Sequence, residues 1–230
     1  MRLLAALAVL LLSAGCATTG STELKDPWEK MNRGIYEFNE SADIAILQPL
    51  AKGYNKLPPF VRERIGNFFG NLDDVANSLN NVLQGKAPEG INDLGRVIVN
   101  STMGILGFWD VATPLGVEKH NEDFGQTLAV WGVNSGPYLV IPFLGPSTLR
   151  DAPARIVDPS WYLGYKLDNS TLSWSLWALN EVQTRANLLK AENVLDTAAI
   201  DRYSFIRDAW LQRRNSLIYD GSPPRVKEEE

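Results

Sequence analysis

EDFGQTLAVWGVNSGPYLVIPFLGPSTLRD, residues 122–151, is the part of this sequence that governs how the chain folds. Its apolar run, Tyr138–Leu144, contains Pro142 and is bounded by Pro137 and Pro146, so the backbone repeatedly lacks an amide donor. Proline is confined to sheet edges and to the first turn of helices, so this run predicts neither a central strand nor a long helix. An irregular and strongly apolar segment suits a place beside a cavity or against lipid.

Side chains of an extended backbone alternate, so we expect Leu139 and Ile141 to point one way and Val140 the other. One of these sets is predicted to lie beside a lipid path, and Phe143 and Leu144 are further candidates for it. The alternative is that all five are ordinary core residues.

The first residues are typical of an export signal. Arg2 precedes the apolar run Leu3–Leu12 and the small residues 13–15, which is too short to span a bilayer. Cys16 follows and is the one cysteine of the chain. We predict a signal peptide over 1–15 and an acylated Cys16, because the site resembles the lipobox of bacterial lipoproteins. A plain secreted protein with a free thiol is the alternative.

The remaining chain divides into three predicted parts. Residues 16–25 are small and polar and form a flexible tether, 26–218 form one helical domain, and the acidic tail 219–230 is disordered. The net charge of −5 argues against a nucleic-acid partner, which requires a basic surface.

Helical periodicity dominates the domain. A first helix is expected to begin with Asp26 as its N-cap and Pro27 in its first turn, and to break at Pro49. A second starts at Pro58-Pro59 and ends before Gly85, with a clean apolar stripe that predicts a core face. The stripe consists of Val61, Ile65, Phe68, Leu72, Val75, Leu79 and Val82 or Leu83.

The segment Ile91–Trp109 is apolar on almost every side, with Arg96 and Asp110 at its polar ends, so it is predicted to be buried or to face hydrocarbon. Two further helices are expected, one around Leu172–Gln183 and one from Asp196 or Asp201. The sequence shows no alternating strand pattern. The fold class is therefore all-α, with proline-rich irregular connections.

Residues that carry catalysis are scarce. His120 is the one histidine and is expected on the solvated surface, and Ser135 does not fit a nucleophile elbow. Nothing in the sequence brings the pair Asp73-Asp74 together with Asp110 or Asp123. We therefore predict no enzyme activity, no metal and no cofactor beyond acyl chains on Cys16.

Short motifs over nearly the whole mature chain carry a family resemblance. They are Asp26-Pro27-Trp28-Glu29, Asn32-Arg33, Tyr36-Glu37-Phe38-Asn39, Asn67-Phe68-Phe69-Gly70-Asn71-Leu72, Leu83-Gln84-Gly85, Gly95-Arg96, Asn100-Ser101-Thr102, Glu122-Asp123-Phe124-Gly125-Gln126-Thr127-Leu128, Trp131-Gly132, Gly136-Pro137-Tyr138 and Leu144-Gly145-Pro146-Ser147-Thr148-Leu149-Arg150-Asp151. Together they resemble the MlaA family of outer-membrane lipoproteins.

The resemblance implies a ring-like helical disc in the inner leaflet of the outer membrane, with a central amphipathic channel. It implies that phospholipids from the outer leaflet pass through this channel to the periplasmic carrier MlaC, and that trimeric porins are partners. Phe38 would lie near the rim that excludes inner-leaflet lipid, which makes it another lipid-path candidate. An envelope scaffold associated with porins and a lipid hydrolase are the alternatives.

Replacing the predicted acylated thiol tests the anchor. Cys16→Ala is expected to leave an unlipidated chain, unprocessed or mislocalised, because stable attachment takes more than one weak membrane signal. Acyl labelling and membrane fractionation measure this. Normal labelling and normal outer-membrane fractionation of the variant would contradict the prediction.

Overall fold

The computed structural model describes residues 26–158, 170–198 and 200–224, so the predicted signal peptide, the tether with Cys16 and the end of the tail lie outside the described residues. The elements follow in the order α2 (Glu29–Ala42), a π-helical turn (Asp43–Leu47), α3 (Gln48–Tyr54), α4 (Pro59–Leu83), α5 (Ala87–Thr102), a 3-10 turn (Thr113–Leu115), α6 (Phe124–Val130), β1 (Tyr138–Ile141), β2 (Gly145–Thr148), α7 (Asp151–Val157), α9 (Ser170–Ala198) and α10 (Arg202–Ile218).

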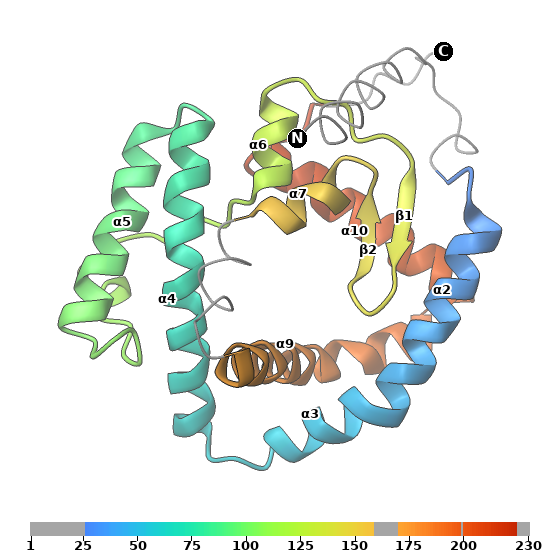
Figure 1. Ribbon diagram of the computed structural model, residues 1–230, viewed down its shortest axis with the longest axis horizontal. Helices are drawn as coiled ribbons and strands as arrows, with labels where there is room; N and C mark the ends of the chain where they lie inside the picture. The colour runs from blue at the N-terminus through green and yellow to red at the C-terminus, as the bar shows by residue number, and fades with distance from the viewer. Residues whose placement is uncertain (1–25, 159–169, 199, 225–230) are drawn as a thin grey trace.

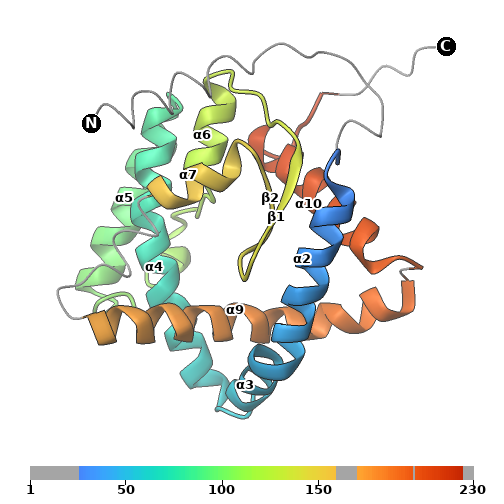
Figure 2. The same ribbon diagram turned by 45° about the vertical axis from the view of Figure 1, so that its right-hand side comes forward.

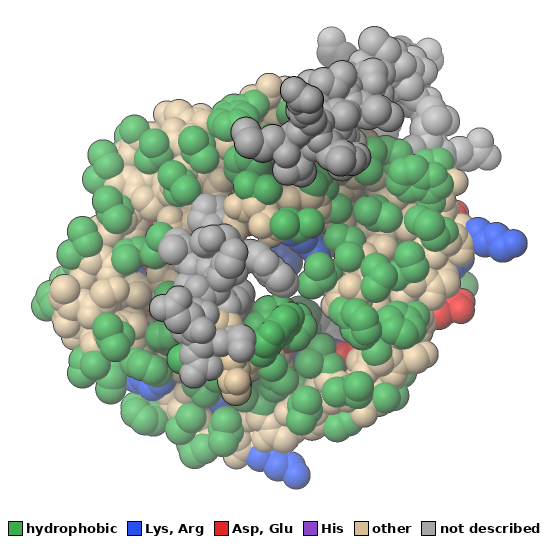
Figure 3. Space-filling view, viewed as in Figure 1, with side chains coloured by type: hydrophobic (Ala, Val, Ile, Leu, Met, Phe, Trp, Pro, Cys, Tyr) green, Lys and Arg blue, Asp and Glu red, His purple; other side chains and the backbone are tan. Residues whose placement is uncertain are grey.

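The helices form a ring (Figures 1 and 2). In Figure 1, α4 and α5 make one side, α9 and α3 the bottom, α2 the opposite side, and α6 and α7 the top. The β hairpin projects from the top toward the middle, with α10 behind it. The space-filling view is hollowed at the same place (Figure 3). The predicted ring-like helical domain is thus confirmed.

The buried residues of the ring are mostly polar, and much of its exposed surface is apolar. Among the described residues, 21 polar or charged residues are buried against 10 hydrophobic ones, and 33 large hydrophobic residues are exposed. Hydrophobic side chains surround the opening in Figure 3, where few charged ones appear. Large exposed apolar patches mark surfaces that contact a membrane, a ligand or another protein, so this surface is a candidate for such contact.

Helix α4 shows this arrangement most clearly. Its buried positions are polar from Asn71 onward apart from Ala76, whereas Leu79 and Val82 are about half exposed. The apolar stripe was correctly placed on one face, but the prediction that its C-terminal part is core was wrong. The polar face packs against α5 and α6, which leaves the apolar side chains of the C-terminal half exposed.

Helix α5 ends earlier than expected. It stops at Thr102, because Ile105, Leu106 and Gly107 all have a positive φ, a conformation that terminates a helix. The Gly107 backbone passes so close to Asn71 of α4 that a Cβ there would overlap its side chain. The segment was predicted to be buried or to face hydrocarbon. Ile91 and Ile98 are exposed, so they do not lie in the core.

Polar contacts join α4 to α5. Arg96, 2% exposed, donates from Nε to Asp74 Oδ2 at 3.0 Å and from Nη2 to Asp110 Oδ1 at 3.2 Å. Arg96 is therefore buried between the helices and does not mark a polar helix end, as the sequence suggested. It also brings Asp74 and Asp110 together, which the sequence did not indicate.

His120 is half-buried, contrary to the expected solvated surface. Its Nδ1 lies 3.0 Å from Oδ1 of the fully buried Asp93 in α5. Asp93 Oδ2 in turn accepts from Asn81 Nδ2 of α4 at 2.9 Å. The segment before α6 is thereby fixed against the α4–α5 pair, which explains why this polar turn is ordered.

The start of α2 differs from the prediction. Trp28 is the N-cap, and Asp26 is instead a buried acceptor for Asn32 Nδ2 at 2.7 Å and for the hydroxyl of Tyr203 in α10. The expected break near Pro49 is present as the π-helical turn, after which α3 continues with Pro49 in its first turn. Proline is tolerated there because its missing amide has no intrahelical partner.

Two antiparallel strands lie in the segment that predicted no regular structure. Tyr138 pairs with Thr148 and Ile141 with Gly145, and the turn between them places Phe143 at φ 63°. Side chains alternate as expected: Tyr138 and Val140 are buried, Leu139 and Ile141 half-buried. The prolines were misleading because a two-stranded hairpin consists of edges, where proline is allowed.

Removing the Arg96 charge tests the polar packing. Arg96→Gln leaves Asp110 without its cation and Asp74 with Lys119 alone, so we expect the free energy of unfolding to fall by about 3–5 kcal/mol. The comparison is Arg33→Gln, whose ion pairs are partly exposed and whose loss should cost about 1 kcal/mol. Denaturant unfolding in detergent measures both. Equal losses of unfolding free energy in the two variants would show that the buried ion pairs stabilise the fold no more than the exposed ones.

Candidate functional site

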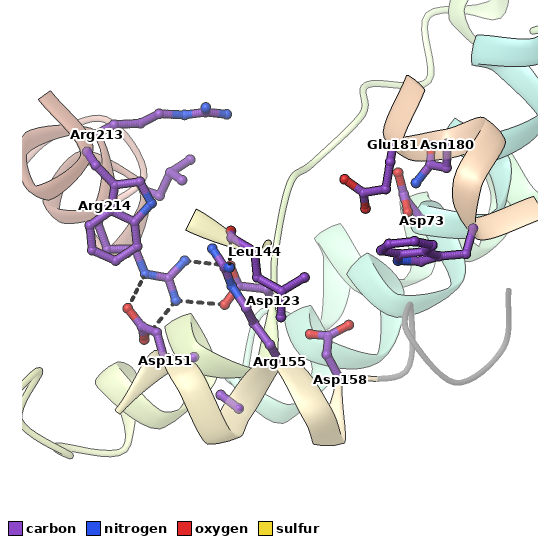
Figure 4. A pocket seen from close by; sticks show the side chains of 15 residues that line it. Asp73, Asp123, Leu144, Asp151, Arg155, Asp158, Asn180, Glu181, Arg213 and Arg214 are labelled. Carbon is purple, nitrogen blue, oxygen red and sulfur yellow. Dashed lines mark hydrogen bonds and ion pairs between the residues drawn. The ribbon is translucent and has the colours of Figure 1, made fainter. Parts of the chain in front are cut away.

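A cavity of about 430 Å³ lies inside the ring. Side chains from α4, α6, α7, α9 and α10 line it together with Leu144 of the hairpin (Figure 4). The lining is mixed: carboxylates and guanidinium groups lie beside Trp177, Trp210 and Leu217. Such a space can surround a ligand that has both charged and apolar parts.

One group of charges in the lining is fully paired. Arg214 of α10 donates to Asp151 Oδ2 from Nε at 2.9 Å and to Asp123 Oδ1 from Nη2 at 2.7 Å, and Arg150 donates to Asp151 Oδ1 at 2.8 Å. A Cβ at Gly125 would overlap Arg214 and Asp151, so this glycine permits the cluster. Two cations and two anions thus neutralise each other and join α6, α7 and α10.

The pKa of Asp123 shows how strong this pairing is. Burial alone would raise its pKa, yet hydrogen bonds from Arg214 hold it below its ordinary value. Asp123 is also the N-cap of α6, where its side chain accepts from Gln126 N. Asp123 is therefore charged at neutral pH, and the cluster joins α6, α7 and α10 at the top of the ring.

A second group of charges faces the cavity without ion pairs. Asp73 and Glu181 line one side of the cavity in Figure 4, and Arg155 lines the opposite side. Burial raises the pKa of Asp73 to about 6 and raises that of Glu181, and it lowers the pKa of Arg155. All three shifts have desolvation as their main cause, so these groups lack the compensation that Arg214 has.

The hairpin is held at the cavity by polar contacts on both sides. Asn32 and Asn39 of α2, seven residues apart and so on one helix face, each bond two backbone groups of the hairpin. On the other side, Arg155 of α7 donates to the Leu144 and Pro146 carbonyl oxygens, both at 3.0 Å. The hairpin tip is thereby fixed beside the cavity.

The tip itself is apolar. Phe143 is 69% exposed and meets the ring of Phe38 edge-on, with centroids 5.2 Å apart. Leu144 lines the cavity and its neighbour Ile141 is half-buried. An apolar tip and a charged cavity side by side give the interior the amphipathic character that was expected.

The structure thus separates the six lipid-path candidates. Phe38, Phe143 and Leu144 come together at the tip, and Leu139 and Ile141 are half-buried on the hairpin face opposite Tyr138. Val140 is 1% exposed and packs in a cluster with Tyr138 and Tyr203, so it belongs to the core. We retain the other five.

Sequence reasoning missed the charged lining. Arg155 and Glu181 were not singled out, and Asp73 was considered as part of an acid pair alone. A signal existed on α9, where Trp177 and Glu181 lie one turn apart on one face, but nothing linked that face to α4 or α7. No group of three or more metal-ligating side chains occurs among the described residues. No helix in the described part of the chain has the length and apolar character needed to cross a bilayer.

Comparisons with known proteins agree on one family. The model of the family described as "MlaA lipoprotein" matches residues 24–217. The "Intermembrane phospholipid transport system lipoprotein MlaA" of Escherichia coli K12 is 34% identical over 221 residues, covering 91% of this chain and 86% of that protein. The protein of the same name from Haemophilus influenzae is 28% identical and covers 98% and 94%.

A solved structure is also similar. It is described as "Structural basis for maintenance of bacterial outer membrane lipid asymmetry" and matches with a TM-score of 0.73 at 31% identity, covering 84% of this chain and 98% of that one. The ring architecture is therefore shared with a protein of known structure.

The raised pKa of Asp73 has a consequence for stability. In the unfolded chain an aspartate loses its proton near pH 3.8, whereas Asp73 in the folded chain loses its proton near pH 6. Between these pH values the folded chain binds more protons than the unfolded chain, so its stability falls as pH rises. Lys119 opposes this shift, and the carboxylates of Asp74 and Asp158 increase it.

Asp73→Asn should therefore raise the free energy of unfolding more at about pH 8 than at about pH 3. Denaturant unfolding of the detergent-solubilised protein at both pH values measures this, with the exposed Glu118→Gln as the matched control. A gain that is the same at both pH values would show that Asp73 is not desolvated.

Proposed function

This chain belongs to the MlaA lipoprotein family, and we propose that it removes mislocalised phospholipid from the outer leaflet of the outer membrane and passes it inward through the ring, which maintains lipid asymmetry. The observation that carries this proposal is the polarity of the ring: large hydrophobic side chains are exposed on most of the described helices, whereas charged side chains line the cavity. A body of this kind is compatible with lipid outside and with a headgroup inside.

The geometry suggests how lipid would be selected. A disc seated in the inner leaflet displaces the lipids of that leaflet and blocks them with its apolar wall, whereas outer-leaflet lipids can enter from above. The charged lining shelters a headgroup that would otherwise cross hydrocarbon at a cost of several kcal/mol. The acyl chains can meanwhile contact the tip formed by Phe38, Phe143 and Leu144.

The partners follow from the same proposal. Acyl chains on Cys16 hold the body at the membrane, and the apolar outer surface lies against lipid and against trimeric porins. On the periplasmic side, the lipid is received by the soluble carrier MlaC. No covalent step is needed, because the lipid leaves unchanged.

Two alternatives predict different results. A scaffold would bind porin but leave outer-leaflet phospholipid unchanged when the gene is deleted. A hydrolase would release free fatty acid from labelled phospholipid. Among the described residues, His120 is engaged with Asp93 and lies away from the cavity lining, which supports transfer without cleavage.

Substitutions in the hairpin test the proposal. Phe143→Asp places a charge at the exposed tip, and aspartate tolerates the positive φ there better than phenylalanine does, so the fold should persist while transfer falls. Val140→Asp buries a charge in the core and should instead reduce the amount of folded protein.

Outer-leaflet phospholipid in a deletion strain that carries each variant measures transfer, and porin co-purification reports the fold. Phe143→Asp should associate with porin but leave phospholipid in the outer leaflet. Full restoration of asymmetry by Phe143→Asp would contradict a lipid path at the tip.

A further inference from the structure

We propose that the cavity recognises a zwitterionic phospholipid headgroup, with the phosphate at Arg155 and Arg213 and a primary ammonium at Asp73 and Glu181. This inference rests on the proposed function, and it adds a headgroup preference to it. The class of substrate is thus a neutral aminophospholipid, and an anionic glycerol headgroup is disfavoured.

The four groups come from four different helices. Asp73 belongs to α4, Glu181 to α9, Arg155 to α7 and Arg213 to α10. In Figure 4 the two carboxylates lie on one side, Arg155 lies between them and α10, and Arg213 extends from α10 above the cavity. The cavity therefore has an anionic pole and a cationic pole.

None of these four charges forms an ion pair with another described residue. Arg155 uses two nitrogens on hairpin carbonyls, which leaves three of its five N–H donors for a ligand. Glu181 is close enough to Arg155 for the positive charge to lower its pKa, yet the two make no salt bridge. A gap that separates opposite charges in this way can admit a ligand with both charges.

The neighbouring Arg214 cluster differs, because its charges are paired within the protein. Arg214 of the same lining is neutralised by Asp123 and Asp151, and Arg150 outside the lining also donates to Asp151. The other charges of the lining are two cations, Arg155 and Arg213, and three anions, Asp73, Glu181 and Asp158, of which Asp158 accepts from the Phe124 amide at 2.7 Å. The two cations can contact the negative charge of a zwitterion, and Asp73 and Glu181 can contact its positive charge. Charge complementarity of this kind gives specificity more than affinity.

Electrostatics point the same way. Burial raises the pKa values of Asp73 and Glu181 and lowers that of Arg155, so desolvation outweighs the opposing interactions at each of the three groups. A bound ammonium stabilises the two carboxylates, and a bound phosphate stabilises Arg155. An anionic lipid without an ammonium satisfies the cationic pole but leaves both carboxylates uncompensated.

An aromatic ring completes the anionic pole. Trp177 lines the cavity one helical turn before Glu181, so both side chains lie on the same face of α9. Indole rings attract cations through their π faces. A primary ammonium has three donors for the two carboxylates, and this combination does not suit a phosphate.

The test uses the full-length lipoprotein in vesicles that contain equimolar phosphatidylethanolamine and phosphatidylglycerol, each with the same photoreactive acyl chain. After illumination, mass spectrometry of the peptides that line the cavity gives the ratio of the two crosslinked lipids. We expect the ethanolamine lipid to exceed the glycerol lipid by about tenfold, the effect of one charge-assisted hydrogen bond.

Three variants separate the poles. Asp73→Asn with Glu181→Gln should bring the ratio close to one, whereas the matched surface pair Glu37→Gln with Glu118→Gln should keep it. Arg213→Gln should reduce crosslinking of both lipids and leave the ratio unchanged, because both carry a phosphate. Arg213 and the control residues are exposed, so these variants should fold.

The outcomes are distinguishable. Equal crosslinking of both lipids by the wild type, or a ratio that survives Asp73→Asn with Glu181→Gln, overturns the headgroup preference but leaves phospholipid in the cavity. If neither lipid crosslinks to the cavity peptides, the proposed function itself is overturned.

Discussion

The Arg96 guanidinium, buried between α4 and α5 against Asp74 and Asp110, represents the constraint on which the rest of the ring depends. With apolar side chains directed outward, burial of hydrophobic surface cannot be the main force that brings these helices together. Polar contacts inside the ring replace it, as interhelical hydrogen bonds do in bilayer proteins. Each of them has to be matched, because an unpaired buried charge costs several kcal/mol.

The same rule explains the interior. The hairpin brings apolar side chains into the ring and is positioned by the amides of Asn32 and Asn39 and by the Arg155 guanidinium. The cavity beside it contains one cluster of charges that is neutralised and holds the helices, and a second group that is not. A structural role accounts for the first group. The second group has no ion pair among the described residues, and we propose that it binds the lipid headgroup.

Much of this architecture could be predicted from the sequence. Helical periodicity located α4, the first half of α9 and, with Asp201 as the start, α10, whereas the alternative start at Asp196 lies inside α9. The alternation of Leu139, Val140 and Ile141 along the hairpin was also predicted. The core face of α4 was predicted wrongly, because periodicity shows that a helix has two faces but not which solvent surrounds it. Asn71, Asn77, Asn80 and Asn81 on the opposite face are buried, which an apolar exterior explains.

The candidate site was less accessible to sequence reasoning. Asp73, Arg155, Glu181 and Arg213 are spread over 141 positions and share no motif, so their proximity depends on the closure of the ring. Arg155 also looks like an ordinary surface residue of a short helix, since its contacts are to hairpin carbonyls far from any pattern. The family resemblance predicted the channel, whereas the division of its lining into an anionic and a cationic pole became visible only in the structure.

The most direct test of this inside-out ring is a measurement of the environment on its two sides. Spin labels at Ile91 and Ile98 on the outside and at Leu217 in the cavity, in the lipoprotein reconstituted in vesicles, report collisions with apolar oxygen and with a water-soluble nickel complex. The account predicts that the outer labels meet oxygen and exclude nickel, and that the cavity label is accessible to nickel. Outer labels that meet nickel as readily as the cavity label would contradict it.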